Sequence, residues 1–365
     1  MTLLKGLKVL DFSTLLPGPF ATLLLSDLGA EVLRIERPSN QKSWIVDQYL
    51  NRSKSSVELD LKKPESVDQV KQLAEEYDIV IEQFRPGVME RLGLGYKDLK
   101  KVNPRIIYCS LTGFGQTGPL KDRPGHDINY LALSGVSGYS GKKAEGPAQN
   151  GTQIADLNGS LYTALAILAA VIYRTQTGEG QSIDMSMTDC SFSLNALFAP
   201  LSLNHGMKLE PEKLMLNGGT FYGYYQTKDG RFFSVGSLEP AFRKELCEAI
   251  GRPDLFDMSM SEHPVDVRLF KEILTATFLE KTFTEWLAIF EKAEACVEPV
   301  LTFEEACEHP HLKERGLIVQ VPDGQGGFQR QIACPIKTSA FHPQYKQVDR
   351  SLRESSGASL NNIHP

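Results

Sequence analysis

The sequence has 365 residues, of which 41% are hydrophobic and 23% are charged, and its formal net charge is −6 at pH 7. A chain of this length is expected to form more than one domain, and its acidic balance argues against a surface built to bind nucleic acid. The six cysteines include no CxxC pair, which favours reduced thiols over a disulfide framework or a zinc site, so we predict no bound metal.

The first half of the chain alternates between strand-like and helix-like segments. Short apolar runs predict strands at 7–13, 31–36, 55–61, 78–84 and 105–111. Between them, 19–30 and 64–77 have the apolar spacing of helices, with Gly29 at an expected helix end and Pro64 at an expected start. Strands that alternate with helices indicate a parallel sheet covered on both faces. We therefore predict a large, Rossmann-like, doubly wound α/β domain.

A long apolar helix at 158–180 and a strand at 181–187 continue this pattern, which changes after about residue 200. There the segment 221–237 predicts a hairpin that turns at Asp229-Gly230. Helical segments follow at 239–251, 266–278 and 284–293. The predicted division is 1–205 for the large domain, 206–315 for a smaller α+β domain, and 316–365 for a C-terminal segment that returns to the large domain.

Membrane-spanning and targeting segments are not predicted. No run reaches the ~20 uninterrupted apolar residues that a membrane-spanning helix needs, and Leu161–Ile172 is expected to be a buried helix instead. The first residues lack the long apolar region and the cleavage site of a signal peptide. We therefore expect a cytoplasmic protein with neither a membrane nor a nucleic acid as its partner.

The loops that follow the predicted strands carry basic residues where many nucleotide-binding sheets carry glycines. The chain contains no GxxxxGK[ST] motif, and its first strand–helix turn is STLLPGPFA, which does not match GxGxxG. The basic residues of these loops are Arg34, Arg37, Arg52, Lys54, Arg85 and Arg91. Two interpretations stay open: they are solvated surface charges, or together they bind a phosphorylated ligand through charge-assisted hydrogen bonds.

Three polar residues stand at the ends of predicted elements, where a rigid scaffold can aim a side chain into a cleft. His126 follows Pro-Gly at the start of an apolar segment, Asp156 comes just before the long helix, and Glu239 lies at a strand–helix junction. Each also has a purely structural explanation. His126 could be a satisfied buried histidine, Asp156 a helix cap, and Glu239 an ordinary acid of a first helical turn.

The sequence resembles the family III CoA-transferase (CaiB/BaiF) superfamily and, within it, the α-methylacyl-CoA racemases. The resemblance runs nearly end to end and weakens after about residue 320. Its motifs are PGP at 17–19, LGAEVLRIERP at 28–38, RPGVMERLGLG at 85–95, TGFGQTGP at 112–119, GHDINYLALSG at 125–135, ADLNGS at 155–160, DGRFFSVGSLEP at 229–240 and ACVEPVLTFEEA at 295–306. The GHDINY motif is the most specific, because it separates the racemase branch from the transferases. The transferases share Asp156 but usually lack this histidine.

The resemblance implies an acid–base pair that racemises an acyl-CoA thioester. His126 and Asp156 are expected to act from opposite faces of a planar enolate, one removing the α-proton while the other returns a proton. Glu239 is expected to orient or charge His126. Because Asp156 must be protonated when His126 is the neutral base, its carboxyl is expected to be desolvated.

The same resemblance implies a CoA site, a homodimer and no separate cofactor, since CoA is part of the substrate. The expected dimer is interlocked, so Glu239 is expected to reach His126 either within one subunit or between two. The expected binding residues start with those for the nucleotide and phosphates and end with those near the thioester. They are Arg37, Leu59, Asp60, Leu61, Lys62, Arg85, Arg91, Gly125, Asp127, Ile128, Asn129 and Tyr130.

Two other functions remain open at this stage. Where racemases tend to show Asp-Phe-x-Gly-Gly, this chain has Leu157 and Asn158 after Asp156. That departure keeps an acyl-CoA:carboxylate CoA-transferase as the alternative, with Asp156 as a nucleophile that forms a mixed anhydride. A third interpretation is an acyl-CoA-binding protein without catalysis. The sequence does not identify the acyl chain.

Overall fold

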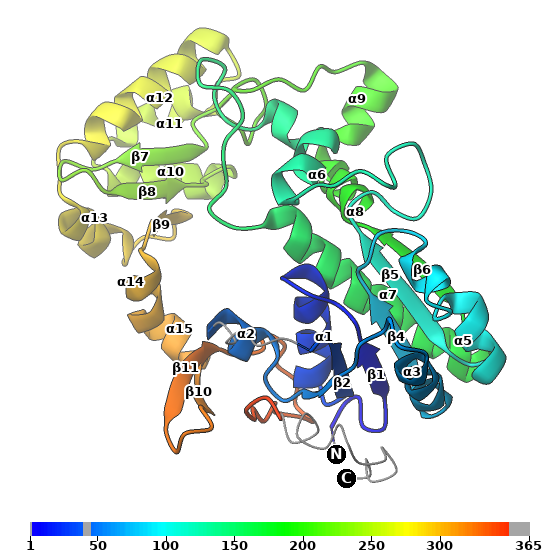
Figure 1. Cartoon of the computed structure of the whole chain (residues 1–365). Coiled ribbons are helices and arrows are strands. Elements are labelled where there is room, and N and C mark those ends of the chain that lie inside the picture. The colour runs from blue at the N-terminus through cyan, green and yellow to red at the C-terminus, as the bar shows by residue number, and fades with distance from the viewer. Residues whose placement is uncertain (1, 39–44, 350–365) are drawn as a thin grey trace. The chain divides into compact units, whose positions relative to one another are not determined.

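A six-stranded parallel sheet in the order β3-β2-β1-β4-β5-β6 forms the centre of the first half of the chain (Figure 1). The computed structural model describes residues 2–38 and 45–349. The strands of this sheet are β1 (Lys8–Asp11), β2 (Glu31–Glu36), β3 (Ser55–Glu58), β4 (Ile79–Glu82), β5 (Ile107–Thr112) and β6 (Ser182–Ser186). The strand order confirms the prediction of a doubly wound α/β fold, whose ligands bind beyond the carboxyl ends of the strands.

Both faces of the sheet are buried, because successive strand residues point to opposite sides and both sets are apolar. Val9, Ile81 and Cys109 pack in one cluster with Ile167 of α7. Their neighbours Leu10, Val80 and Tyr108 pack in another cluster, which includes residues of α3 and α5. The helices of this half are α1 (Pro17–Asp27), α2 (Ile45–Leu50), α3 (Pro64–Glu76), α4 (Val88–Arg91), α5 (Tyr96–Val102), α6 (Asp127–Leu133), α7 (Ile154–Thr177) and α8 (Met187–Ser193).

The helix α7 differs from its prediction, because only one of its faces is buried. Ile167 and Ala170 lie in the core, whereas Leu161, Leu165 and Ile172 are more than half exposed. Within the described residues, α7 is also the one helix long and apolar enough to cross a membrane by length and composition alone. It packs against α1 and β5, as a core helix of a sheet does.

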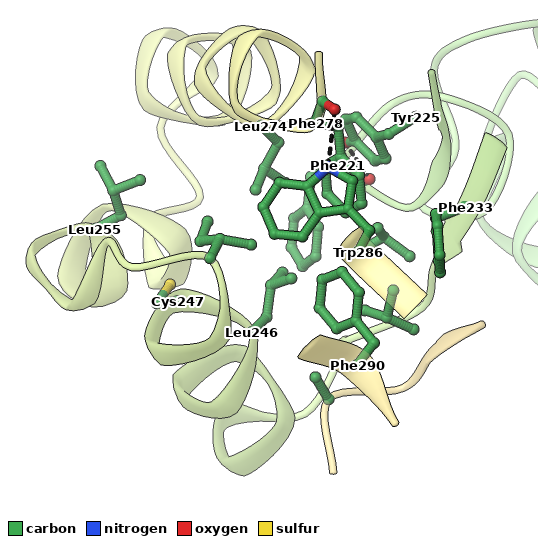
Figure 2. Close-up of a cluster of buried hydrophobic side chains, with 14 of the residues drawn as sticks. Phe221, Tyr225, Phe233, Leu246, Cys247, Leu255, Leu274, Phe278, Trp286 and Phe290 are labelled. Atoms are coloured by element: carbon green, nitrogen blue, oxygen red, sulfur yellow. Dashed lines mark hydrogen bonds between the residues drawn. The ribbon is translucent and has the colours of Figure 1, made fainter. Parts of the chain in front are cut away.

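The second half contains a three-stranded antiparallel sheet packed on helices through an aromatic core. The predicted hairpin is confirmed: β7 (Gly223–Gln226) pairs with β8 (Phe232–Val235), which pairs with β9 (Val297–Pro299). Figure 2 shows the core, in which the Trp286 indole N–H donates to the Phe278 carbonyl at 2.9 Å. The remaining helices are α9 (Ala199–His205), α10 (Pro240–Ala249), α11 (Phe256–Met260), α12 (Pro264–Phe278), α13 (Phe283–Phe290) and α14 (Phe303–Glu308), with 3-10 turns at Val136–Tyr139, Leu194–Leu197 and Pro253–Leu255.

The chain divides into two compact units. Of the described residues, one unit contains 2–38, 45–134, 150–195 and 311–349, and the other contains Gly135–Gln149 and Ala196–Pro310. This division differs from the predicted boundaries mainly at Gly135–Gln149. The segment belongs to the second unit, although it lies inside the range 1–205 predicted for the large domain.

The C-terminal segment packs with the first unit. After α15 (Pro310–Glu314), β10 (Ile318–Pro322) and β11 (Phe328–Ile332) form an antiparallel hairpin. The chain then runs beside β3, where the Asp349 N–H donates to the Lys54 carbonyl at 2.9 Å and the Ser56 N–H donates to the Asp349 carbonyl at 3.1 Å. Residues 350–365 of the predicted segment lie outside the described residues.

Candidate active site

Several residues predicted to bind CoA follow the carboxyl ends of neighbouring strands. Arg37 comes directly after β2, and Arg85 follows β4. The predicted strand 55–61 ends at Glu58, which leaves 59–62 as a loop. The sheet order therefore places these positions along one edge, in the sequence β3, β2 and β4.

Within this set the side chains differ in exposure. Leu59 is buried in the core below the loop. The Asp60 carboxylate accepts from the Lys62 N–H at 3.2 Å, which shapes the turn, and Leu61 is half-buried against the same core. Arg37, Lys62, Arg85 and Arg91 are exposed, so their charged ends are accessible to an anionic ligand.

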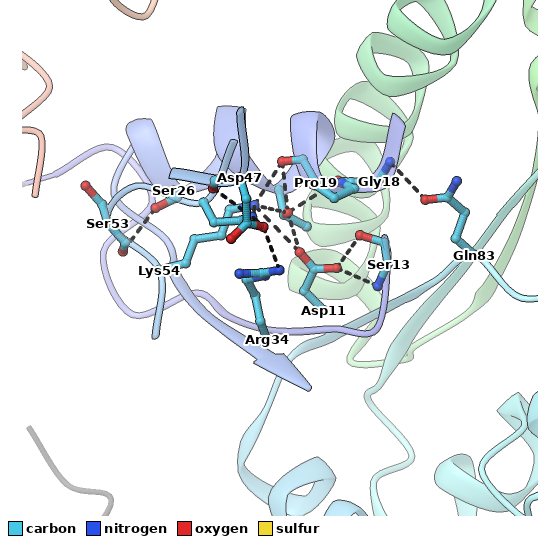
Figure 3. A network of polar contacts seen from close by, with 12 residues as sticks. Asp11, Ser13, Gly18, Pro19, Ser26, Arg34, Asp47, Ser53, Lys54 and Gln83 are labelled. Carbon is cyan, nitrogen blue, oxygen red and sulfur yellow. Dashed lines mark hydrogen bonds and ion pairs between the residues drawn. The ribbon is translucent and has the colours of Figure 1, made fainter. Parts of the chain in front are cut away.

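Three of the six basic residues taken as phosphate-binding candidates are instead buried in ion pairs, which corrects that interpretation. Figure 3 shows two of them, Arg34 and Lys54. Arg34 pairs with Glu36 at 2.7 Å and with Asp47 at 3.3 Å. Arg52 and Lys54 are almost wholly buried. Their charges therefore stabilise the fold and do not face a ligand.

Asp27 and Asp11 are the partners of these two buried cations. The Arg52 guanidinium lies 2.6 Å from Asp27. The Lys54 ammonium lies 3.7 Å from Asp11 and donates to the Thr22 hydroxyl at 2.7 Å. Burial lowers the pKa of Lys54 to about 7, and the Asp11 carboxylate opposes that change.

A pocket of 570 Å³ opens at the same edge, beyond β4 and β5. Its wall combines apolar side chains with basic ones and includes no acidic residue. His126 lines it, as do Gly125, Asn129 and Tyr130 of the predicted set. Its full lining is Gln83, Phe84, Arg85, Pro86, Leu111, Thr112, Gly113, Phe114, Lys121, Arg123, Pro124, Gly125, His126, Asn129, Tyr130 and Met187.

Tyr130 fixes the loop that carries His126. The buried Tyr130 ring packs edge-on against Phe114, with 5.2 Å between centroids, and its hydroxyl donates to the Gly125 carbonyl at 2.6 Å. A Cβ atom added at Gly113 or Gly125 would lie 2.4 Å or 2.7 Å from this ring. Glycine is therefore required at both positions for the close approach.

His126 is the residue that precedes α6, and its imidazole is exposed at the pocket. Its backbone N–H donates to the Asn129 side-chain oxygen at 3.0 Å, which fixes the start of the helix. The histidine is thus a helix-start residue and a pocket residue at once, which rejects the alternative of a buried histidine. Ile128, two residues after His126, is also exposed.

Asp156 lies inside the first turn of α7 and not before the helix as predicted. It does not cap the helix, because the N–H groups of Ala155 and Asp156 donate to Asp127 instead, at 2.6 Å and 3.0 Å. Burial raises the pKa of Asp156 to about 6; the Asp127 charge adds to that rise and His126 opposes it. Asp156 therefore interacts electrostatically with both Asp127 and His126, and its own backbone N–H is held by Asp127.

Glu239 belongs to the second unit, where it precedes α10 and is exposed. Its predicted partnership with His126 therefore stays a prediction. Arg91 ends α4, and its guanidinium lies near the backbone of Gly87. Among the residues that the structure describes, no group of three His, Cys, Asp or Glu side chains is arranged to hold a metal ion.

Two basic residues of the pocket and the hydrogen bonds of the Asp127 carboxylate were not predicted from the sequence. Lys121 and Arg123 line the pocket on the loop before His126, and the KDRPGH sequence contained the signal, because two cations closely precede the predicted catalytic residue. The Asp127 carboxylate accepts hydrogen bonds from the start of α7, and the predicted contact of Asp127 with the substrate stays a prediction.

Comparison with known proteins agrees with this geometry. Residues 4–349 match the model of CoA-transferase family III. An alpha-methylacyl-CoA racemase of Homo sapiens is 41% identical over 94% of this chain and 89% of its own length. A succinyl-CoA:glutarate CoA-transferase of Homo sapiens is 33% identical over 87% of this chain and 76% of its own length.

Solved structures with the same fold are also similar. A CAIB/BAIF family protein from Brucella suis has a TM-score of 0.83 and 28% identity, with 98% of each chain covered. Rv3272 from M. tuberculosis has the same TM-score and identity, over 98% of this chain and 99% of that one. The family match, the relatives and the carboxyl-edge pocket lead to one conclusion: this chain is a member of CoA-transferase family III.

Proposed function

We propose that this enzyme interconverts (R)- and (S)-2-methylacyl-CoA thioesters by removing and returning the α-proton. The observation that supports this most directly is the raised pKa of Asp156, about 6, at a carboxyl whose charge interacts with His126. A carboxyl with this pKa is accessible in both protonation states near neutrality. That property is what a site needs if each group must be an acid in one direction and a base in the other.

The reaction proceeds in two proton transfers. In one direction the neutral His126 imidazole takes the α-proton, and the electron pair left on the α-carbon delocalises into the thioester carbonyl as an enolate. The protonated Asp156 carboxyl then delivers its proton to the opposite face, which inverts the centre. In the other direction the Asp156 carboxylate removes the proton and protonated His126 returns one. Backbone N–H groups at the start of α6 are proposed to stabilise the enolate oxygen.

The exposed cations at the sheet edge suit the phosphates of CoA. Arg37 and Lys62 are proposed to bind its nucleotide end, and Arg85 and Arg91 its phosphates. The thioester would then enter the pocket beside His126, whose apolar wall of Phe84, Leu111, Phe114 and Met187 suits an acyl chain. No further cofactor is proposed, because the mechanism uses side chains and the substrate alone.

A homodimer is proposed as the functional state. The cytoplasm is proposed as its location. The exposed apolar residues of α7 and the neighbouring α8 support it: Leu161, Leu165, Ile172 and Phe192 are each more than half exposed. A second copy covering this face would remove from water an apolar surface of a kind that monomers rarely expose. In such a dimer Glu239 is proposed to orient His126.

The test is α-proton exchange in deuterium oxide. The wild-type protein is incubated with one enantiomer of a 2-methylacyl-CoA and no carboxylic acid. Deuterium incorporation together with loss of optical purity is expected. The variants His126→Ala and Asp156→Asn should each lower the exchange rate by at least 100-fold, while the control His342→Ala, at an exposed histidine, should not. No exchange by the wild-type protein with any such substrate would contradict the proposal.

The alternative is a CoA-transferase, which the 33% identical transferase relative favours. There the Asp156 carboxylate attacks the thioester carbonyl, the carbon–sulfur bond breaks, and an enzyme-bound mixed anhydride forms with release of the CoA thiolate. Hydroxylamine would trap that anhydride at Asp156 only after an acyl-CoA is added. In this case His126→Ala retains acyl transfer, whereas under the racemase proposal it loses exchange. An acyl-CoA-binding protein without catalysis would show neither reaction.

A further inference from the structure

The first turn of α7 is held by a side chain from another helix. The residue before α7, Gln153, makes no capping hydrogen bond through its side chain. The first N–H groups of any helix lack acceptors within the helix. Here one carboxylate oxygen of Asp127 accepts from the N–H groups of Ala155 and Asp156, at 2.6 Å and 3.0 Å. These are the positions that a capping side chain normally binds, yet Asp127 lies 28 residues from Ala155 in sequence.

This contact joins the two elements that carry the acid–base pair. Asp127 is the first residue of α6 and directly follows His126. Its two hydrogen bonds end on the backbone of α7 at Asp156 itself and at the residue before it. Hydrogen bonds to an ionised carboxylate are short and about twice as strong as neutral ones. A single side chain therefore fixes the start of α7 relative to the residue beside His126.

The same carboxylate places a negative charge next to Asp156. The titratable groups that interact with Asp156 are Asp127, His126 and Tyr130. The pKa of the Tyr130 phenol is raised by burial and by both aspartates, so Tyr130 is neutral. Asp127 is thus the one negative charge among them, and it disfavours a second negative charge on Asp156.

We propose that Asp127 is a positioning residue: it fixes the place of the Asp156 carboxyl relative to His126 and supplies a negative charge that favours the protonated form of this carboxyl. This role differs from the expectation that Asp127 binds CoA. The inference rests on the acid–base role of Asp156 proposed above. Together with burial, it explains why a carboxyl in a helical first turn, where the helix dipole favours the ionised form, nevertheless has a raised pKa.

Two variants separate the structural part from the electrostatic part. Asp127→Asn keeps an oxygen that accepts hydrogen bonds but removes the charge, whereas Asp127→Ala removes both. The matched control is Asp122→Asn, an exposed aspartate on the same loop that does not line the pocket. Thermal unfolding of all three variants shows whether each is folded before it is assayed.

Two measurements need no substrate. Hydrogen–deuterium exchange of the amides at 155 and 156 should be at least 10-fold faster in Asp127→Ala than in the wild type, and should change little in Asp127→Asn. The ¹³C carboxyl signal of Asp156, assigned with Asp156→Asn, should titrate at a lower pH in Asp127→Asn. Unchanged amide exchange in Asp127→Ala, or an unchanged Asp156 titration in Asp127→Asn, would overturn the proposal.

Kinetics supply the third measurement. In Asp127→Ala, kcat for α-proton exchange should fall 10- to 100-fold with KM within about 3-fold, because a displaced acid slows the chemical step more than binding. In Asp127→Asn, the pH dependence of kcat that reports the titration of Asp156 should move to lower pH, whichever enantiomer is the substrate. A 10-fold higher KM with an unchanged kcat would instead show a binding role. If the wild type shows no exchange at all, the proposed function fails, while the two substrate-free measurements still decide this inference.

Discussion

Replacement of Arg52 should destabilise the first unit severely, because the change leaves a buried carboxylate without its partner. Both Arg52 and Asp27 have side chains only 1% exposed. The guanidinium donates to the two oxygens of Asp27 at 3.0 Å and 2.6 Å, and also to Gln331 at 3.2 Å and to the Ile332 carbonyl at 2.6 Å. Removing one member of a buried ion pair typically costs about 3–5 kcal/mol.

The size of this loss depends on Asp27, which a double variant can show. Asp27→Leu combined with Arg52→Met replaces the pair with apolar side chains of similar size, and such replacements are often neutral. The Gln331 and Ile332 acceptors still lose their donor, at roughly 1 kcal/mol each. We therefore expect Arg52→Met alone, which loses both the ion pair and these two contacts, to cost about 5–7 kcal/mol, and the double variant to cost about 2 kcal/mol.

Urea unfolding followed by far-ultraviolet circular dichroism measures these free energies. Circular dichroism reports on the helices and strands of both units, whereas the fluorescence of Trp286 reports on the second unit. The coupling energy between the two substitutions comes from the double-mutant cycle with Asp27→Leu. A loss below about 1 kcal/mol for Arg52→Met, or a double variant as unstable as the sum of the single ones, would refute the reasoning from an uncompensated buried charge.

Two further predictions concern the network around Lys54. Because the pKa of Lys54 is lowered to about 7 in the folded state, the unfolded chain binds more protons above pH 7, and the free energy of unfolding should rise with pH by up to about 1.4 kcal/mol per unit. Lys54→Met should remove that rise between pH 7 and 9, as urea titrations at several pH values would show, and an unchanged slope would contradict it. Gly18→Ala would place a Cβ atom 2.1 Å from that of Ser13, so we expect a loss of about 1–3 kcal/mol in the same assay, and a neutral substitution would show that this turn adjusts freely.

Much of the first unit follows from the sequence, because its strands are short apolar runs separated by helices. The alternation that places Val9 and Leu10 in opposite clusters requires a sheet covered on both faces. The same fold predicts that a ligand binds beyond the carboxyl ends of the strands. The assignment of His126 and Asp156 came from family resemblance, since spacing alone left structural explanations open for both.

The partners of the basic residues could not be predicted in this way. Arg52 and Lys54 lie in a polar stretch that has the composition of an exposed loop. They are buried because Asp27 of α1 and Asp11 of β1 reach them in space. Such pairings depend on strand order, which sequence periodicity does not contain. The exposed side of α7 was missed for a related reason, because an apolar face is equally suited to a core and to a subunit interface.

The buried network also explains why we propose that exposed arginines and lysines bind the phosphates. In dinucleotide-binding sheets the first strand–helix turn uses free backbone N–H groups to hold phosphate. Here that turn already has its own acceptors: the Ser13 N–H donates to Asp11 at 2.9 Å, and the Gly18 N–H donates to Gln83 at 3.2 Å (Figure 3). An anion there would have to displace the Asp11 carboxylate and meet its charge. The proposed CoA phosphates are therefore expected along the sheet edge, at cations such as Arg37 and Arg85, whose side chains form no ion pair among the residues that the structure describes.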